Sequence, residues 1–168
     1  MIQRKLSLVI SISLLSQPIF ALPTDKNQVV KVFADSADLS QLLHRGIYKG
    51  HVEFNQGTTN IRAQTAITKG NTDNQLQSAI AQGSKTEQAH YWTEAGDGKP
   101  TLHAYADSIR YYPLLHLIKL KGNARVEQGK NSLSAATIIY DTEAQHVITT
   151  SEGSKRTTII FYPEKKAS

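Results

Sequence analysis

Residues 104–139 read AYADSIRYYPLLHLIKLKGNARVEQGKNSLSAATII, and they repeat without a gap the pattern of residues 32–67. The offset is 72 residues throughout, so that Lys49-Gly50 returns as Lys121-Gly122 and Gln56-Gly57 returns as Gln128-Gly129. Thirteen of the thirty-six positions are identical, whereas unrelated sequences of ordinary composition would share about two. One supersecondary unit has therefore been copied in tandem, and such copies usually stack into one continuous surface or cavity.

Within each copy, alternating apolar and polar residues predict a β-hairpin, because successive side chains of a strand point to opposite faces. The glycine of each Gln-Gly pair supplies the tight turn, since glycine adopts a positive φ without steric cost. The residues expected to share the inward face are Tyr48, Gly50, Val52, Phe54, Ile61, Ala63, Thr65 and Ile67 in the first copy, and Leu120, Gly122, Ala124, Val126, Leu133, Ala135, Thr137 and Ile139 in the second.

The fold class predicted for residues 30–163 is all-β and antiparallel. Pro113 disfavours a helix at 111–117, and hence at the matching segment 39–45. After the hairpins the repeat is expected to continue at an offset of 70, since Gly83-Ser84-Lys85 matches Gly153-Ser154-Lys155. Short strands separated by turn residues are typical of a roll, sandwich or barrel. Many inward positions are small, which indicates either a flat, tightly packed roll or a trough that an apolar ligand completes.

The first 21 residues resemble a secretory signal. Arg4 and Lys5 precede an apolar run at 6–15 that is too short to span a membrane, and a cleavage site follows at Ala21. We therefore expect a removed segment 1–21, a flexible N-terminus at 22–29 and a disordered tail at 164–168. An uncleaved N-terminal anchor is the alternative, because Ile19 is not the small residue preferred three positions before the cut.

Composition excludes several classes of function. The chain has no cysteine, so disulfides, thiolate metal sites and cysteine nucleophiles are excluded. Its formal charge of +5 falls to +3 without Arg4 and Lys5, and the basic residues are scattered without interleaved aromatics, which argues against a nucleic-acid partner. His44 and His116 recur, as do Asp35 and Asp107, but turn-forming roles explain them better than metal binding or acid–base catalysis. We expect no enzymatic activity, no metal and no cofactor.

The order of several motifs is similar to the OstA-like repeat family of periplasmic lipopolysaccharide transport proteins. The motifs are the Ala-Asp pair, the segment from Tyr48 to Gly57 with its Gly-x-Val-x-Phe-x-Gln-Gly pattern, Asp97-Gly98-Lys99-Pro100, Leu120-Lys121-Gly122-Asn123-Ala124 and Lys155-Arg156-Thr157-Thr158. The similarity covers about 30–163, with repeat units at about 30–95 and 102–163. The segment Leu114-Leu115-His116 is more apolar than the family pattern.

The resemblance implies a β-jellyroll, a V-shaped roll of two antiparallel sheets, whose interior holds the acyl chains of lipid A. It also implies end-to-end self-association, an LptC-type inner-membrane partner at the N-terminal edge and an LptD-type outer-membrane partner at the C-terminal edge, all in the periplasm. Family positions and strand alternation together predict an interior lipid-binding set: Val30, Val32, Phe54, Ile61, Tyr91, Tyr111, Val126, Leu133 and Ile139.

Three other functions stay open at this point. The chain could be an LptC-type membrane-linked partner, an exported structural β-repeat domain with a filled core, or a monomeric lipoprotein chaperone of the half-barrel kind. The duplication and the lack of a long helical pattern disfavour the last of these. Cleavage after Ala21 would count against the first.

Overall fold

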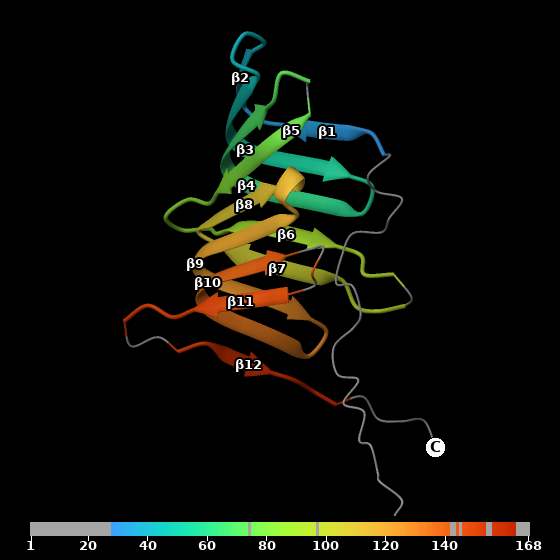
Figure 1. Cartoon of the computed structure of the whole chain (residues 1–168), viewed down its shortest axis with the longest axis vertical. Coiled ribbons are helices and arrows are strands. Elements are labelled where there is room, and N and C mark those ends of the chain that lie inside the picture. The colour runs from blue at the N-terminus through green and yellow to red at the C-terminus, as the bar shows by residue number, and fades with distance from the viewer. Residues whose placement is uncertain are drawn as a thin grey trace, which may run out of the picture.

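A computed structural model describes residues 28–73, 75–96, 98–141, 144, 146–153 and 156–163. The predicted signal segment and C-terminal tail, and most of the predicted flexible N-terminus, lie outside these residues. The described chain is almost entirely β-structure (Figure 1). Its elements are β1 (Val30–Phe33), β2 (Ser36–Ser40), β3 (Arg45–Gln56), β4 (Thr59–Gly70), β5 (Leu76–Gln82), β6 (Ala89–Thr93), β7 (Leu102–Ala106), β8 (Ser108–Tyr112), the 3₁₀ turn η2 (Pro113–Leu115), β9 (Leu117–Gln128), β10 (Asn131–Asp141), β11 (His146–Thr150) and β12 (Thr158–Ile160).

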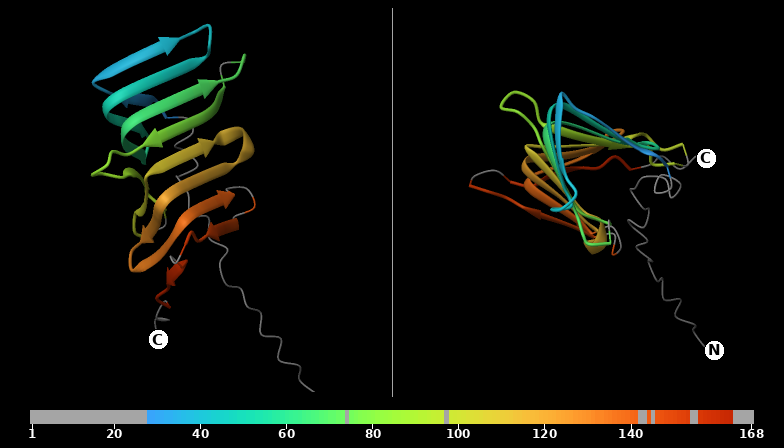
Figure 2. Two further views of the ribbon diagram at one scale, coloured as in Figure 1. Left: turned by 90° about the vertical axis from the view of Figure 1, so that its left-hand side faces the viewer. Right: turned by 90° about the horizontal axis from the view of Figure 1, so that it is seen from above.

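Four long strands, β3, β4, β9 and β10, each run through two sheets. One half of each strand joins β1, β6, β7 and β12 in the order β1-β3-β4-β6-β7-β9-β10-β12, which we call arm I. The other half joins β2, β5, β8 and β11 in the order β2-β3-β4-β5-β8-β9-β10-β11, which we call arm II. Seen along the long axis, the two arms form a V that is open on one side (Figure 2). The predicted fold class, an antiparallel V-shaped jellyroll, is confirmed.

A β-bulge bends the long strands at the corner of the V. In β3, Gly50 and His51 both have positive φ and together face one residue of β4, and Gly122 and Asn123 do the same in β9 against β10. Such a bulge increases local twist and turns the strand into the second sheet. The Asp35 N–H donates to the Gly50 carbonyl at 2.9 Å, and the Asp107 N–H donates to that of Gly122 at 2.9 Å. The recurring Ala-Asp motif is thus part of the corner.

Small side chains close the V at this corner. Ala89 and Ala106 pair across β6 and β7 and have no exposed surface, and four further alanines join them in the core with Ile109, Leu120 and Ile138. Alanine lets the two arms approach closely where they meet. The inward alanines therefore form the packed end of the V, so close packing, one of the two outcomes that the sequence left open, holds at this corner.

The duplication is visible strand by strand. Strands β1 to β4 return as β7 to β10 at the predicted offset of 72. Ile67 of β4 pairs with Ile80 of β5, and its copy Ile139 of β10 pairs with Ile148 of β11. Ile148 is therefore the counterpart of Ile80, so β11 corresponds to β5 at an offset of 68 residues. The predicted offset of 70 is wrong here, because the β4–β5 turn is four residues longer than its counterpart. The sequence analysis did not predict strands β2 and β8. It did predict that residues 39–45 and 111–117 form no α-helix, and the structure agrees.

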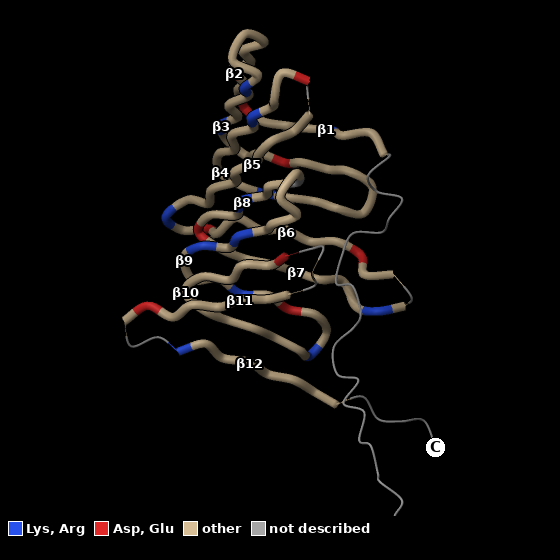
Figure 3. Tube along the Cα trace, in the orientation of Figure 1, with Lys and Arg blue, Asp and Glu red and all other residues tan. Residues whose placement is uncertain are grey.

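Lysine and arginine are scattered over both arms and interspersed with acidic residues (Figure 3). Among the described residues, no helix is long and apolar enough to cross a membrane.

Candidate functional site

An unbroken row of side chains crosses the inner face of arm I. Residues that face each other in an antiparallel pair point to the same side of the sheet. The registers connect eight strands through one such row, which we call the inner row: Val32, Phe54, Ile61, Tyr91, Ala104, Val126, Leu133 and Ile159. Every member is apolar or aromatic, so a continuous hydrocarbon surface extends from one end of the molecule to the other.

The inner row is more exposed than an ordinary core. Phe54, Ile61, Tyr91, Val126 and Leu133 are half-buried, and several of them pack on the alanine cluster of the corner. At the two ends, Val32 is 38% exposed and Ile159 is 71% exposed, because no further strand covers them. Val30 points the same way as Val32, two residues along β1, and is 49% exposed. The row therefore presents apolar surface to the space between the arms.

Arm II contributes a facing surface. Its inner face carries a buried row, Ala81, Ile109, Leu120 and Ile138, and farther from the corner a half-exposed row that includes Tyr111, Ile118 and Tyr140. Burial raises the pKa of Tyr140 to about 12, and the nearby Asp141 charge adds to this rise. Burial also raises the pKa of Tyr111. Both phenols lie in surroundings that disfavour charge.

The predicted site residues fall into two groups. Val30, Val32, Phe54, Ile61, Tyr91, Val126 and Leu133 lie on the inner face of arm I, and Tyr111 lies on the inner face of arm II. Ile139 does not join them. It pairs with Lys119 and Ile148 on the outer face of arm II, next to the inward-facing Ile138.

The position of Ile139 follows from the bend at the corner. The bulge of β9 lies opposite Ala136. Because of it, the core residues of β10 on either side of the bend, Ala135 and Ile138, are three residues apart and not two. Simple alternation fails across such a bend. Ile67, Thr65 and Thr137 face outward for the same reason, whereas the prediction placed them inside.

The recurring histidines and aspartates have local structural roles. His44 and His116 adopt positive φ at the ends of matching turns. His51 Nδ1 lies 2.8 Å from Asp35 Oδ2, and this hydrogen bond and the Asp35 charge raise the pKa of His51. In the second copy, Asn123 Nδ2 donates to Asp107 Oδ2 at 3.0 Å. Within the described part of the chain, no three histidine or acidic side chains are placed to hold a metal.

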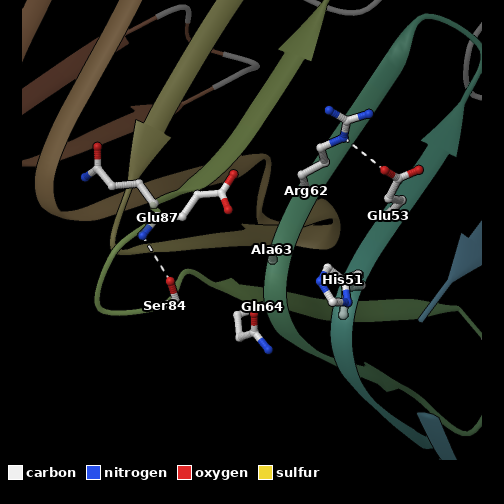
Figure 4. Close-up of a pocket in the computed structure, with 9 residues that line it drawn as sticks. His51, Glu53, Arg62, Ala63, Gln64, Ser84 and Glu87 are labelled. Carbon is white, nitrogen blue, oxygen red and sulfur yellow. Dashed lines mark hydrogen bonds and ion pairs between the residues drawn. The ribbon is translucent and has the colours of Figure 1, made fainter. Parts of the chain in front are cut away.

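A polar hollow lies where β4 exchanges its neighbour β5 for β6 (Figure 4). Its lining includes His51, Gln64 and Glu87, together with Glu53, whose Oε1 lies 3.0 Å from Arg62 Nε. That ion pair joins the two groups at the surface, where such a pair contributes little to stability. The hollow is separate from the inner row and differs from it in chemistry.

The outer face of arm I holds a column of stacked rings that the sequence did not reveal. His90 stacks between Trp92, at 4.7 Å between centroids, and Tyr105, at 4.3 Å. Arg62 covers the Trp92 ring and Arg125 covers the Tyr105 ring. Desolvation, then His103 and Arg62, lower the pKa of His90 to about 4. The signal that could have located them is the spacing of two residues between His90 and Trp92 and between His103 and Tyr105, which puts the rings of each strand on one face.

Comparison with known proteins gives a consistent result. Residues 31–146 match the model of the family described as "LptA/(LptD N-terminal domain) LPS transport protein". The chain is 29% identical over 154 residues to the lipopolysaccharide export system protein LptH of Pseudomonas aeruginosa, covering 88% of this chain and 86% of that protein. It is 26% identical over 162 residues to LptA of Escherichia coli K12, covering 95% and 86%.

The fold has a solved counterpart in the crystal structure of LptH from Pseudomonas aeruginosa, described as the LptA-homologous periplasmic component of the lipopolysaccharide transport device. The TM-score is 0.73 with 27% identity, covering 84% of this chain and all of that one. These relatives are transport components and not enzymes, in agreement with the prediction that the chain catalyses no reaction.

Proposed function

Since this chain belongs to the LptA/(LptD N-terminal domain) family of lipopolysaccharide transport proteins, we propose that it carries lipopolysaccharide by holding the lipid A acyl chains against its inner face. In this proposal it acts in the periplasm, after removal of segment 1–21, and it bridges transport components of the inner and outer membranes by end-to-end assembly.

The inner row is the observation that supports the carrier role most strongly. Each of the eight strands of arm I contributes one apolar or aromatic side chain to this row. Exposing an acyl tail of about a dozen methylenes to water costs on the order of 10 kcal/mol, at about 0.8 kcal/mol per methylene. A surface as apolar as a membrane interior removes that cost without tight binding, which suits a molecule that must be passed on.

The open strands at both ends support assembly. Within the residues that the structure describes, strands β1 and β2 pair only with β3, and strands β11 and β12 pair only with β10. Unpaired strand edges are templates for a further strand. Arms I and II could therefore both continue into a second protomer, the β12 edge meeting β1 and the β11 edge meeting β2.

The join between the two copies inside the chain provides a template for the join between protomers. Internally, β5 pairs with β8 and β6 pairs with β7. The pairs to transfer are Ala79 of β5 with Tyr111 of β8, and Tyr91 of β6 with Ala104 of β7. Adding 68 to the first residue of each pair and subtracting 72 from the second pairs Val147 with Leu39 of the next protomer, and Ile159 with Val32 of the next protomer. Both pairs share an inward face, so the inner row would run on without interruption. An assembly of this kind is heterologous and open-ended.

The same edges suit the membrane partners. An LptC-type inner-membrane protein would add its last strands to β1 and β2, and an LptD-type outer-membrane protein would receive β11 and β12. Any partner that presents the same jellyroll edge would continue both arms, so one geometry would serve self-association and both proposed partners.

Equilibrium binding of purified lipopolysaccharide to two matched variants tests the carrier role. Leu133→Asn places an amide in the inner row, whereas Ile139→Asn makes the same kind of change six residues along the same strand on the outer face. We expect affinity about tenfold lower for the first and unchanged affinity for the second. Equal losses, or none, would refute the proposed binding surface.

A further inference from the structure

The outer face of arm II gathers basic side chains that lie far apart in the sequence. Among the paired strand residues that point outward there, six are lysine or arginine and two, Asp38 and Asp141, are acidic, which gives a formal charge of +4 (6 − 2). We call the six basic residues the basic set: Arg45, Lys49, Lys69, Arg110, Lys119 and Lys121.

Isoleucines lie between these charges. The middle row of the outer face, followed by register from β2 to β11, is Asp38, Ile47, Ile67, Ile80, Arg110, Lys119, Ile139 and Ile148. Ile67 is 38% exposed and Ile148 is 48% exposed. The pair Ile67–Ile80 returns as Ile139–Ile148 four strands farther on, a distance of about 19 Å. Neighbouring apolar side chains among polar ones on an outer face are typical of an interaction surface.

The basic set has no counter-charge of its own. None of its members forms an ion pair with a carboxylate of the described residues. Arg110 Nε is covered and has no hydrogen-bond partner in the same part of the chain. On the outer face of arm I, by contrast, Arg62 pairs with Glu53 at 3.0 Å and Arg125 pairs with Glu127 at 3.3 Å. Arm II therefore presents uncompensated positive charge, which attracts an anionic partner.

We propose that the outer face of arm II docks on an anionic phospholipid bilayer, with the basic set against the lipid phosphates and the isoleucines at the boundary between headgroups and acyl chains. Basic residues near such a surface and apolar side chains at that boundary both favour binding. A second copy of the chain would bring the same positive face, so like charges oppose self-pairing through it. A bilayer offers phosphate and hydrocarbon all along its surface, which suits a pattern that repeats about every 19 Å.

Docking through the outer face is independent of the proposed carrier role, because it leaves the inner row free. The strands of arm II follow one another along the long axis of the molecule (Figure 1). A docked protomer therefore lies with its long axis parallel to the bilayer, whereas a bridge between two membranes would run across the space between them. The docked protomer is thus one that has not joined the bridge.

A fluorophore placed on either outer face tests which side meets the bilayer, since the chain has no cysteine of its own. Ile148→Cys puts an environment-sensitive label on arm II, and Ile160→Cys puts it on arm I at nearly the same exposure, 48% and 47%. Each labelled protein, isolated after export, is mixed with vesicles of phosphatidylcholine alone or with phosphatidylglycerol added. We expect a blue shift only from the Ile148 position and only with phosphatidylglycerol. Equal shifts at the two positions, or none at either, would overturn the proposal.

Two matched lysine pairs test the role of the basic set. Lys119→Gln with Lys121→Gln removes two charges from it, whereas Lys31→Gln with Lys130→Gln removes two charges from arm I. In flotation with phosphatidylglycerol vesicles, we expect about tenfold weaker binding for the first pair and unchanged binding for the second. Equal losses would contradict a role for this face, and capture of an acidic protein without vesicle binding would replace the bilayer with a protein partner.

Binding of dispersed lipopolysaccharide to the same variants separates this proposal from the carrier role. Lys119 and Lys121 point away from the inner row, so both pairs should bind lipopolysaccharide as the original chain does. Loss of vesicle binding with lipopolysaccharide binding intact is the expected result for the first pair. Loss of lipopolysaccharide binding in that pair would show that the face is not a separate docking surface.

Discussion

The alternation of side chains placed four of the five residues predicted from it on the inner face, namely Phe54, Ile61, Val126 and Leu133, and the family resemblance supplied the other four inward residues. The sequence pattern sufficed for Phe54 and Leu133 because each lies on a straight half of its strand. It failed for Ile139, which lies beyond the bulge, where alternation alone cannot show which side of the strand is turned inward. A bend of this kind depends on long-range pairing with Gly122 and Asn123, and that pairing is not visible in the pattern of β10 itself.

The ring column on arm I predicts a pH dependence of stability. His90 has a pKa of about 4 in the fold against 6.5 for the free side chain, so folding favours the neutral ring. Its contribution is full above pH 6.5, decreases as the pH falls toward about 4, and is constant below that, because both states are then protonated. His103 and Arg62 oppose its protonation, while Glu53 and Glu127 are held by Arg62 and Arg125.

Thermal unfolding of the original chain and of His90→Phe between pH 7.5 and 4.5 measures this effect. The phenylalanine keeps a ring next to Trp92 and Tyr105 and cannot take up a proton. It also removes the hydrogen bond between His90 Nε2 and His103 Nδ1 at 3.0 Å, so the slopes with pH are compared and not the unfolding temperatures themselves. We expect the unfolding temperature of the original chain to fall more steeply with acidification than that of the variant. Parallel curves would show that His90 does not contribute.

At the scale of strands, the duplication predicted most of the architecture, since β1, β3 and β4 recur as β7, β9 and β10. Strands β2 and β8 were missed because they contain Asp38 and Arg110 among alternating residues and end at turns rich in leucine. Their strand form depends on pairing with β3 and with β5 and β9. Tertiary pairing here outweighs local propensity.

The closed corner predicts an asymmetric response to one substitution in the two copies. Ala106 has no exposed surface and pairs with Ala89, so Ala106→Leu should overpack the corner and destabilise the chain by about 1–3 kcal/mol. Ala34 is the same position in the first copy but is only half-buried, because no strand precedes it. Denaturant unfolding should therefore detect a small effect for Ala34→Leu, and similar losses in both variants would contradict this account of the corner.

At the scale of the whole molecule, the end strands make the protein an open segment of a longer structure. All four end strands have mostly exposed residues. Sequence repetition indicated that the chain could continue between protomers. The proposed register required the structure, because the offset changes from 72 to 68 between the long strands and β11.

Paired cysteines test this register, and the chain has none of its own to interfere. Val147→Cys with Leu39→Cys should give disulfide-linked oligomers on oxidation, since facing residues of antiparallel strands lie within disulfide range. Ile148→Cys with Leu39→Cys is the control, because those side chains would face opposite sides. Equal cross-linking in the two pairs, or a concentration-independent monomer in both, would exclude the proposed junction.

Photo-cross-linking in cells tests the central claim most directly. A photoreactive amino acid is placed at Phe54, at Leu133 or at the outward-facing Ile139, and the irradiated protein is blotted for lipopolysaccharide. The account predicts adducts from Phe54 and Leu133 and none from Ile139. No adduct from either inner position, or equally strong adducts from all three, would contradict it.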